Sequence, residues 1–214
     1  MTAFVIAMDS EAAALTANLG GAVESVEYGR RTVRGTLNGV RTMVVVSGIG
    51  KANAAAATQF AIQSGARHIV NTGVCGGIEP GMAPGELYEV SAAVEYDFDL
   101  AKINGTAVGV LNERSSPYIA MSVSGNLPSK ILATGDHFND GDGDLPLLVE
   151  LKAGLRDMEG AVVAHVCETA GIACSALKCV TNIVGASGTA QYAANLSSCI
   201  AILTRYFAHF RPPC

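Results

Sequence analysis

The chain has 214 residues, half of them apolar and 15% charged, which is enough apolar sequence to bury one substantial core. Its formal net charge is −5, and its lysines and arginines form no basic patch or stripe, which argues against nucleic acids and anionic membranes as partners. The first residues, MTAFVIAMDSE, carry no positively charged leader, and their apolar run is too short for a signal sequence or a membrane span. A cytoplasmic protein with a small neutral or cationic ligand is therefore expected.

Short β-branched runs alternate with alanine-rich segments of helical length along the whole chain. Strands are predicted at residues 3–8, 41–47, 67–73, 86–96, 130–136 and 173–182. Helices are predicted at 51–65, 160–171 and 192–210, with Gly65 and Gly171 at the ends of the first two. Residues 30–46 alternate around a glycine-containing turn, so a hairpin is expected and the sheet is mixed. We expect one α/β domain over residues 1–214, a three-layer sandwich around a largely buried central sheet.

Two features resemble metal sites, and both have a simpler interpretation. The glycine-rich loop NDGDGDLP at 139–146 lacks the spacing and the terminal glutamate of an EF-hand, so a solvated loop is predicted. The cysteines show no C-x-x-C spacing, and most lie in apolar runs, which predicts buried reduced thiols, with zinc or disulfides as the alternatives. They are Cys75, Cys167, Cys174, Cys179, Cys199 and Cys214. No metal or other cofactor is expected.

Polar residues gather directly after the predicted strands. Asp9 and Glu11 follow the first strand, the glycine-rich stretch NTGVCGG occupies 71–77, and TGDHF, DMEG and TNIVG follow later strands. Ligands of open α/β sheets collect at the carboxyl ends of the strands, so a binding site is predicted there. The glycines have a structural alternative, because tight turns also need glycine. Taken singly, Asp9 and Asp157 are more simply interpreted as helix N-caps or as partners of a helix dipole. Glu11 and Glu159 are stronger functional candidates because each closely follows a strand and a methionine.

Taken together, these stretches resemble a known family. AMDSEAAAL, VVVSGIGKANAAAAT, VNTGVCGG, TGDHF, DMEGAVVAHVC and TNIVG match, in order, the purine nucleoside phosphorylase and nucleosidase superfamily. Within it, the chain looks most like the 5'-methylthioadenosine/S-adenosylhomocysteine nucleosidases. The resemblance implies a single α/β domain with a mixed, partly barrel-like sheet, a homodimer, and cleavage of the bond between ribose and a purine through an oxocarbenium-like transition state.

The resemblance also implies roles for the matching residues. Glu11 would activate the attacking water, and Glu159 would bind the 2'- and 3'-hydroxyls with Met158 beneath the sugar. Phe138 would stack on the base, although core packing is the alternative for it and for the other apolar pocket residues. The remaining residues expected to bind substrate are Met8, Ile49, Val74, Cys75, Gly76, Asp157, Lys178 and Tyr192.

The departures from the family pattern concern the same site. Asn182 stands where the hydrolases carry the aspartate that protonates N7, and an amide cannot deliver a proton. Asn182 is nevertheless assigned to the catalytic site, where it could hold adenine or, as in the 6-oxopurine phosphorylases that it resembles, donate to O6. Val74 replaces a serine, and Lys178 replaces an arginine that orients the nucleophile. His137 has no counterpart; it is either a loop histidine or part of the missing acid function.

Three functions follow from this pattern. The leading prediction is a purine nucleoside N-ribosyl hydrolase, since Glu11 places negative charge where a phosphorylase binds phosphate. A phosphorylase is the first alternative, if Arg30 or Arg31 supplies an anion site, for example across a subunit boundary. The second alternative is a nucleoside-binding protein with little or no turnover, because the acid position and two supporting positions have changed.

Overall fold

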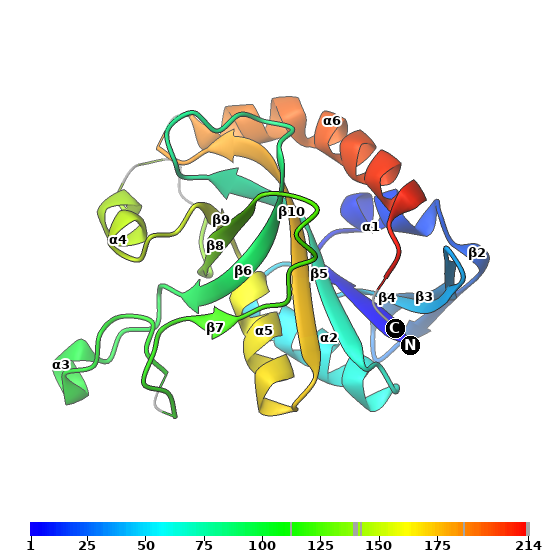
Figure 1. The fold of residues 1–214 in the computed structure, drawn as a ribbon, viewed down its shortest axis with the longest axis horizontal. Coiled ribbons are helices and arrows are strands. Elements are labelled where there is room, and N and C mark those ends of the chain that lie inside the picture. The colour runs from blue at the N-terminus through cyan, green and yellow to red at the C-terminus, as the bar shows by residue number, and fades with distance from the viewer. Residues whose placement is uncertain (112, 139–140, 142, 186, 213–214) are drawn as a thin grey trace.

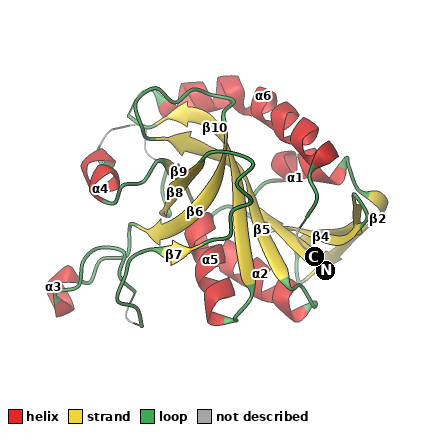
Figure 2. Ribbon diagram, viewed as in Figure 1, coloured by secondary structure: helices red, strands yellow, loops and turns green. Residues whose placement is uncertain are grey.

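A mixed sheet of ten strands forms the centre of the structure, a computed structural model that describes residues 1–111, 113–138, 141, 143–185 and 187–212 (Figures 1 and 2). The strands are β1 (Thr2–Ile6), β2 (Gly20–Glu27), β3 (Arg30–Leu37), β4 (Val40–Val46), β5 (His68–Gly77), β6 (Leu87–Glu95), β7 (Ile119–Ala120), β8 (Ser129–Thr134), β9 (Leu155–Asp157) and β10 (Ala173–Ile183). The helices are α1 (Asp9–Thr16), α2 (Lys51–Gln63), α3 (Ala101–Asn104), α4 (Leu145–Glu150), α5 (Gly160–Thr169) and α6 (Gly188–His209).

One half of the sheet closes on itself. Its order runs β10-β6-β8-β9-β5-β1-β4-β3-β2, and β10 also pairs with β5, so β5, β6, β8, β9 and β10 form a five-stranded barrel. Parallel pairs such as β1–β5 and β5–β10 meet antiparallel ones such as β5–β9 and β6–β10, which confirms a mixed sheet. Register shifts in β6 and β10 fall where such a sheet has to bend. The partly barrel-like architecture is therefore confirmed.

Helices cover both faces of this sheet, as expected for three layers. α1 and α6 lie together on one face and α2 and α5 on the other (Figure 1). Alanines at 54, 57, 61, 161 and 164 are buried where α2 and α5 pack, and their small side chains allow a close approach. α6 buries Cys199, Leu203 and Phe207 on its inner side. Within the described residues, no helix is both long enough and apolar enough to span a membrane.

Several local predictions are confirmed and others need correction. Gly65 and Gly171 follow the last residues of α2 and α5 with φ of 93° and 64°, the left-handed conformation that glycine allows at a helix end. The predicted hairpin is present as β3–β4, but it has a third strand, β2, that was not foreseen. The first strand ends at Ile6 rather than at residue 8, and α6 begins at Gly188 rather than at residue 192.

The cysteine prediction is confirmed where the structure describes it. Cys75, Cys167, Cys174, Cys179 and Cys199 are free thiols in buried positions. Cys214 lies outside the described residues, as do residues 139, 140 and 142 of the glycine-rich loop, so the solvated-loop prediction remains untested. Among the described residues, no group of three or more histidine, cysteine, aspartate or glutamate side chains is arranged to hold a metal.

Candidate active site

A cavity of about 340 Å³ opens at the carboxyl ends of the barrel strands and of β1. Two buried glutamates that are 148 positions apart in the chain, Glu11 and Glu159, both line it. Its wall contains twelve of the thirteen candidate residues, namely Met8, Glu11, Ile49, Val74, Cys75, Gly76, Phe138, Asp157, Met158, Glu159, Asn182 and Tyr192. The site predicted from the strand ends is thus a single hollow of a size suited to a small ligand.

Glu11 is held by backbone N–H groups. It lies in the first turn of α1, where one carboxylate oxygen accepts from the N–H of Met8 at 3.1 Å, as in a capping box. The other oxygen accepts from the N–H of Val74 at 2.8 Å. A side chain at Gly73 would reach within 2.5 Å of this carboxylate, so only glycine permits the close approach. Burial raises the pKa of Glu11, although the hydrogen bond from the Val74 N–H acts to lower it. A raised pKa makes the carboxylate a better acceptor of a proton.

Glu159 approaches the cavity from another direction. It is the residue before α5, and its carboxylate accepts from the N–H of Gly50 at 2.9 Å. Gly50 adopts φ of 98°, which lets the loop before α2 turn this N–H toward the carboxylate. Burial raises the pKa of Glu159 to about 7, and the negative charge of Asp157 adds to the effect, while Lys178 and the Gly50 N–H oppose it.

Asp157 and Lys178 form a buried ion pair beneath these glutamates. Their charged atoms are 2.7 Å apart, and both side chains are only 2% exposed. Asp157 also accepts from the N–H of Gly160 at the start of α5 at 2.9 Å and from the Thr134 hydroxyl at 2.5 Å, so both of its oxygens are engaged. Burial acts to lower the pKa of Lys178, but the surrounding carboxylates outweigh it and the pKa is raised. Lys178, the thirteenth candidate, lies behind Asp157 and does not line the cavity.

The opposite end of the cavity is formed by Asn182 and its neighbours. The Thr181 hydroxyl lies 2.9 Å from the amide oxygen of Asn182 and 3.2 Å from the carbonyl of Cys75. A side chain at Gly76 would come within 3.3 Å of the amide nitrogen, so this glycine leaves the amide open toward the cavity. Arg156 lines the same end. Hydrogen-bond donors of Asn182 and Arg156 thus join Asp157 in this part of the wall.

Two aromatic side chains and an isoleucine surround the mouth. The rings of Phe138 and Tyr192 meet edge to face at 6.0 Å, and the Tyr192 hydroxyl lies 3.4 Å from the sulfur of Met8. Phe138 and Ile49 are each about half exposed, at 51% and 53%. Side chains of this kind are suited to covering the flat face of a base and the edge of a sugar.

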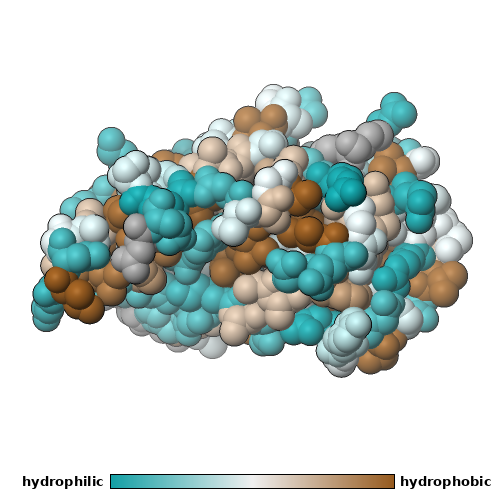
Figure 3. Space-filling model, turned by 90° about the horizontal axis from the view of Figure 1, so that it is seen from below, coloured by the Kyte–Doolittle hydropathy of each residue, from teal (hydrophilic) through white to brown (hydrophobic). Residues whose placement is uncertain are grey.

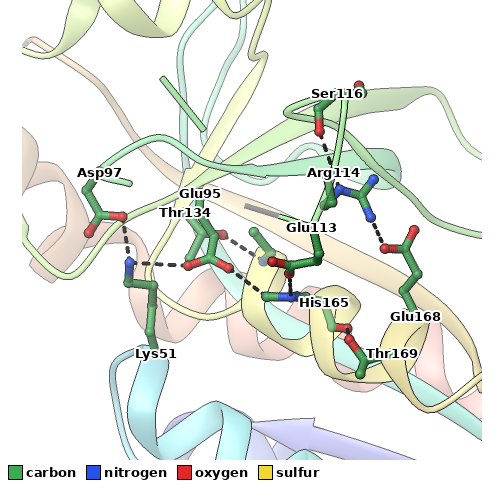
Figure 4. A network of polar contacts seen from close by, with 11 residues as sticks. Lys51, Glu95, Asp97, Glu113, Arg114, Ser116, Thr134, His165, Glu168 and Thr169 are labelled. Carbon is green, nitrogen blue, oxygen red and sulfur yellow. Dashed lines mark hydrogen bonds and ion pairs between the residues drawn. The ribbon is translucent and has the colours of Figure 1, made fainter. Parts of the chain in front are cut away.

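A ring of polar contacts ties the loops at this mouth together. The backbone N–H of Lys51 donates to Asp136 at 2.7 Å, the N–H of Asp136 donates to Asp97 at 3.0 Å, and the Lys51 ammonium returns to Asp97 at 2.6 Å. Figure 4 shows Lys51 between Asp97 and Glu95, from which the contacts continue through His165 to Glu113. The ring joins the segments that carry Ile49, Gly50 and Phe138.

Some candidates lie away from the cavity. Arg31 binds Asp9 at 3.2 Å and Glu24 at 2.7 Å on the N-terminal hairpin, and neither Arg30 nor Arg31 lines the cavity. His137 contacts Asp144 at 2.8 Å and reaches only a side chamber of about 40 Å³ beside the cavity. The lining residues that sequence reasoning missed are Ala7, Arg156, Thr181 and Thr189. Thr181 adjoins Asn182 in the TNIVG stretch, whereas nothing in the sequence singled out Arg156.

A second hollow, of about 520 Å³, lies near the opposite ends of β5 and β10. Two of its titratable groups are already engaged, since His68 contacts the Ser175 hydroxyl at 2.9 Å and Glu89 accepts from the N–H groups of Ser124 and Gly125. Among its described lining residues Glu89 is the single carboxylate, so the smaller cavity, with its pair of buried glutamates, is the candidate active site.

Comparisons with known proteins find nucleosidases among the relatives of this chain. A 5'-methylthioadenosine/S-adenosylhomocysteine nucleosidase of Geobacillus kaustophilus is 29% identical over 204 residues, which cover 86% of this chain and 84% of the relative. An aminodeoxyfutalosine nucleosidase of Campylobacter jejuni is 27% identical over 156 residues, covering 67% of this chain and 68% of the relative.

Solved structures show the same fold. A nucleosidase mutant of Helicobacter pylori with 5'-methylthioadenosine in its active site matches with a TM-score of 0.89 and 24% identity, covering 96% of this chain and 95% of that one. The 5'-methylthioadenosine/S-adenosylhomocysteine nucleosidase of Neisseria meningitidis, in complex with methylthio-immucillin-A, also matches with a TM-score of 0.89. It is 21% identical, and the match covers 97% of this chain and 96% of that one. The model of the phosphorylase superfamily matches residues 2–208, and this chain therefore belongs to that superfamily.

Proposed function

We propose that this chain is a purine nucleoside N-ribosyl hydrolase. The observation that carries the proposal is the convergence of two buried carboxylates, Glu11 and Glu159, on one cavity of about 340 Å³. Relatives that hydrolyse nucleosides support the same reaction, since those named above are nucleosidases of 5'-methylthioadenosine, S-adenosylhomocysteine and aminodeoxyfutalosine.

In the proposed reaction, water attacks C1' while the bond from C1' to the base breaks and its electron pair leaves with the base. Glu11 takes a proton from the water, a role that its raised pKa suits. Ionised Glu159 binds the 2'- and 3'-hydroxyls, and its negative charge stabilises the positive charge that develops on the sugar. Met158 would lie beneath the sugar. Asp157, which lines the cavity, and Lys178, which does not, would act on Glu159 through their charges.

We assign the remaining cavity residues to the base and the 5' group. Phe138 and Tyr192 would pack against the base, with Met8, Ile49 and the Val74–Gly76 backbone completing the wall. Asn182 would read the base. An amide can donate to O6 or N7 but supplies no proton, so we propose a preference for 6-oxopurines over 6-aminopurines.

Release of free base from inosine and adenosine, measured by chromatography, tests this function. We expect base release without added phosphate, and Glu11→Gln should reduce it at least 1,000-fold, because loss of the base and disturbance of the water site act together. Turnover that persists in Glu11→Gln would refute the assigned role. Tight binding of nucleoside with no turnover by the wild type would identify a binding protein instead.

Water is favoured over phosphate as the attacking group. Arg31, which could have bound phosphate, is paired with Asp9 and Glu24, and the buried Glu11 carboxylate would repel an anion at the same place. Base release that depends strictly on added phosphate would reverse this assignment.

The cellular setting belongs to the same proposal. We expect a homodimer, as the family resemblance implies, and a cytoplasmic location, as the first residues suggest. Figure 3 shows hydrophobic surface near the middle of one face, surrounded by hydrophilic residues, which is the kind of surface that subunit contacts use. Light scattering at several protein concentrations would measure the mass of the particle, and a monomer at all of them would contradict the dimer.

A further inference from the structure

The base end of the cavity offers no free acid to a departing purine. The described carboxylates that line the cavity are Glu11, Asp157 and Glu159, and all three are already accounted for. Glu11 and Glu159 serve the water and the ribose in the proposed function, while Asp157 is taken up by Lys178, Thr134 and Gly160. Another group has to stabilise the electron pair that leaves with the base.

Arg156 is placed to do this. It lines the cavity beside Asn182, and it also lines the adjoining chamber of about 40 Å³, together with Gly76, Phe138 and His137. Lys178 lines neither space, so among the described residues Arg156 is the permanently charged cation of this end. Its side chain is only 8% exposed, which strengthens its charge interactions relative to those of a surface arginine.

The guanidinium of Arg156 is held rigidly by three neighbours. One of its nitrogens lies 2.9 Å from Asp144 and donates to the backbone carbonyl of His137 at 3.1 Å. The guanidinium carbon also lies 5.4 Å from the centre of the Tyr96 ring. Asp144 is shared with His137, at 2.8 Å, so it does not belong to Arg156 alone. Both of these polar contacts use the same terminal nitrogen, and the guanidinium also hydrogen-bonds the Tyr96 hydroxyl. A guanidinium has five N–H donors, so further donors remain for a ligand.

A guanidinium only donates hydrogen bonds, so it discriminates between the two classes of purine. Hypoxanthine and guanine present two acceptors on one edge, O6 and N7, whereas adenine presents an amino group that would point N–H against N–H. When the glycosidic bond breaks, its electron pair spreads over the purine and reaches O6 in a 6-oxopurine. A fixed positive charge near O6 would stabilise that anion without giving up a proton.

We propose that Arg156 is a specificity-determining residue that binds the O6 and N7 edge of a 6-oxopurine and stabilises it as the leaving group. This inference rests on the proposed function, and it makes inosine-type nucleosides the substrate class. In this step the water oxygen bonds to C1', and one proton of the water goes to Glu11. The bond from C1' to the base breaks, and the base departs as an anion held by Arg156 and Asn182. The anion then takes a proton from Glu11 or from solvent.

Kinetics with inosine and adenosine test Arg156 directly. Arg156→Met removes the donors and the charge but keeps most of the side-chain length, and we expect kcat/KM for inosine to fall about 10- to 100-fold, the size of one hydrogen bond from a charged donor. The kcat/KM for adenosine should change less than about threefold. The ratio of kcat/KM for inosine to that for adenosine should therefore fall at least about threefold. Arg156→Lys should recover part of the ratio, because it keeps the charge and loses the fork. Arg114→Met is the matched control, since Arg114 is also a partly buried, ion-paired arginine but lies outside the cavity.

The ratio separates the proposal from a purely structural role. An equal loss for both nucleosides, or an unchanged ratio, would refute it. If wild-type protein cleaves neither nucleoside, the proposed function fails, and calorimetry with free hypoxanthine and adenine still decides about Arg156. Loss of hypoxanthine binding alone in Arg156→Met would uphold the base-reading role, and loss of neither or of both would refute it.

Discussion

The two ends of the cavity are built from different parts of the chain. At the ribose end, backbone N–H groups of Met8, Val74 and Gly50 hold the two glutamates. At the base end, the contacts come from the side chains of Asn182 and Arg156. Backbone donors are set by the fold and survive changes of neighbouring residues, whereas one substitution replaces a side-chain donor.

This difference explains where the chain keeps the family pattern and where it departs from it. Val74 has replaced a serine of the resembling family, yet its backbone N–H, which any residue except proline would supply, still donates to Glu11 at 2.8 Å. The change of aspartate to asparagine at position 182 has no such substitute, because the side chain itself lines the cavity. We therefore expect the reaction type to be conserved at the ribose end and the base preference to be set at the base end.

The largest effect should come from breaking the ion pair that supports the ribose end. Lys178→Met leaves the Asp157 charge buried without its partner, and we expect a loss of about 3–5 kcal/mol in the free energy of unfolding. Adding Asp157→Asn removes the unpaired charge, so the double variant should recover part of this loss. Urea unfolding of the three proteins measures both values. A loss below about 1 kcal/mol in Lys178→Met would mean that the pair is not sealed from water.

The second prediction concerns the pH dependence of the ribose end. Glu159 has to be ionised to stabilise the sugar cation, and its pKa is raised to about 7, so kcat/KM should fall as the pH drops below about 7. Glu159→Gln should lower kcat/KM about 100- to 1,000-fold and shift this acidic limb, because protonation of Glu11, whose pKa is also raised, then sets what remains of it. A wild-type profile that stays flat from pH 8 to pH 5.5 would contradict an ionised Glu159.

The same group has an opposite effect on stability. Its folded pKa lies above the ordinary value of 4.5, so between these values the folded chain binds more protons than the unfolded chain. Stability should therefore fall as the pH rises from about 4.5 to about 7, and Glu159→Gln should lessen that fall. Urea unfolding at pH 5 and pH 8 tests this, with Glu150→Gln on the surface of α4 as the control. An equal fall in Glu159→Gln and the control would exclude Glu159 as the cause.

The base end can be tested by restoring an acid. Asn182→Asp supplies a group that can protonate N7 and accept from an exocyclic amine, so the ratio of adenosine to inosine turnover should rise about 10- to 100-fold. Initial rates with both nucleosides measure the ratio. An unchanged ratio would show that residue 182 does not read the base, and the specificity would then have to come from elsewhere in the wall.

Sequence reasoning reached the ribose end more completely than the base end, for physical reasons. Glu11 and Glu159 follow strands in short motifs, and the rule that ligands bind at the carboxyl ends of strands predicts both at the same edge of the sheet. Arg156 lies in β9, a strand of three residues, where no pattern distinguishes a cavity-lining arginine from a solvated one. The Lys178–Asp157 contact joins distant segments, so its geometry follows only from the closed barrel.

The fold shows the same limits. The longer buried strands β1, β4, β5, β6, β8 and β10 have apolar runs, and their ends were predicted to within four residues. The short strands β7 and β9 were not predicted. The edge strand β2, sequence GGAVESVE, is mostly exposed, so it lacks an apolar signal and was missed. α1 was also not foreseen, because its eight residues are too few for a clear period and its start coincides with the functional motif MDSE.

The smallest effect should come from the ring of contacts at the cavity mouth, which serves both ends. Lys51→Met removes the ammonium that joins Asp97 and Glu95, and the loops carrying Ile49 and Phe138 lose a common support. Because the ring is partly exposed, we expect a loss of about 1 kcal/mol in binding, that is, a three- to tenfold rise in KM with little change in kcat. Steady-state kinetics measure it, with Lys102→Met in α3 as a surface control. A fall in kcat at unchanged KM would show instead that Lys51 acts through the Gly50 N–H on Glu159, which would make the ring a part of the ribose end alone.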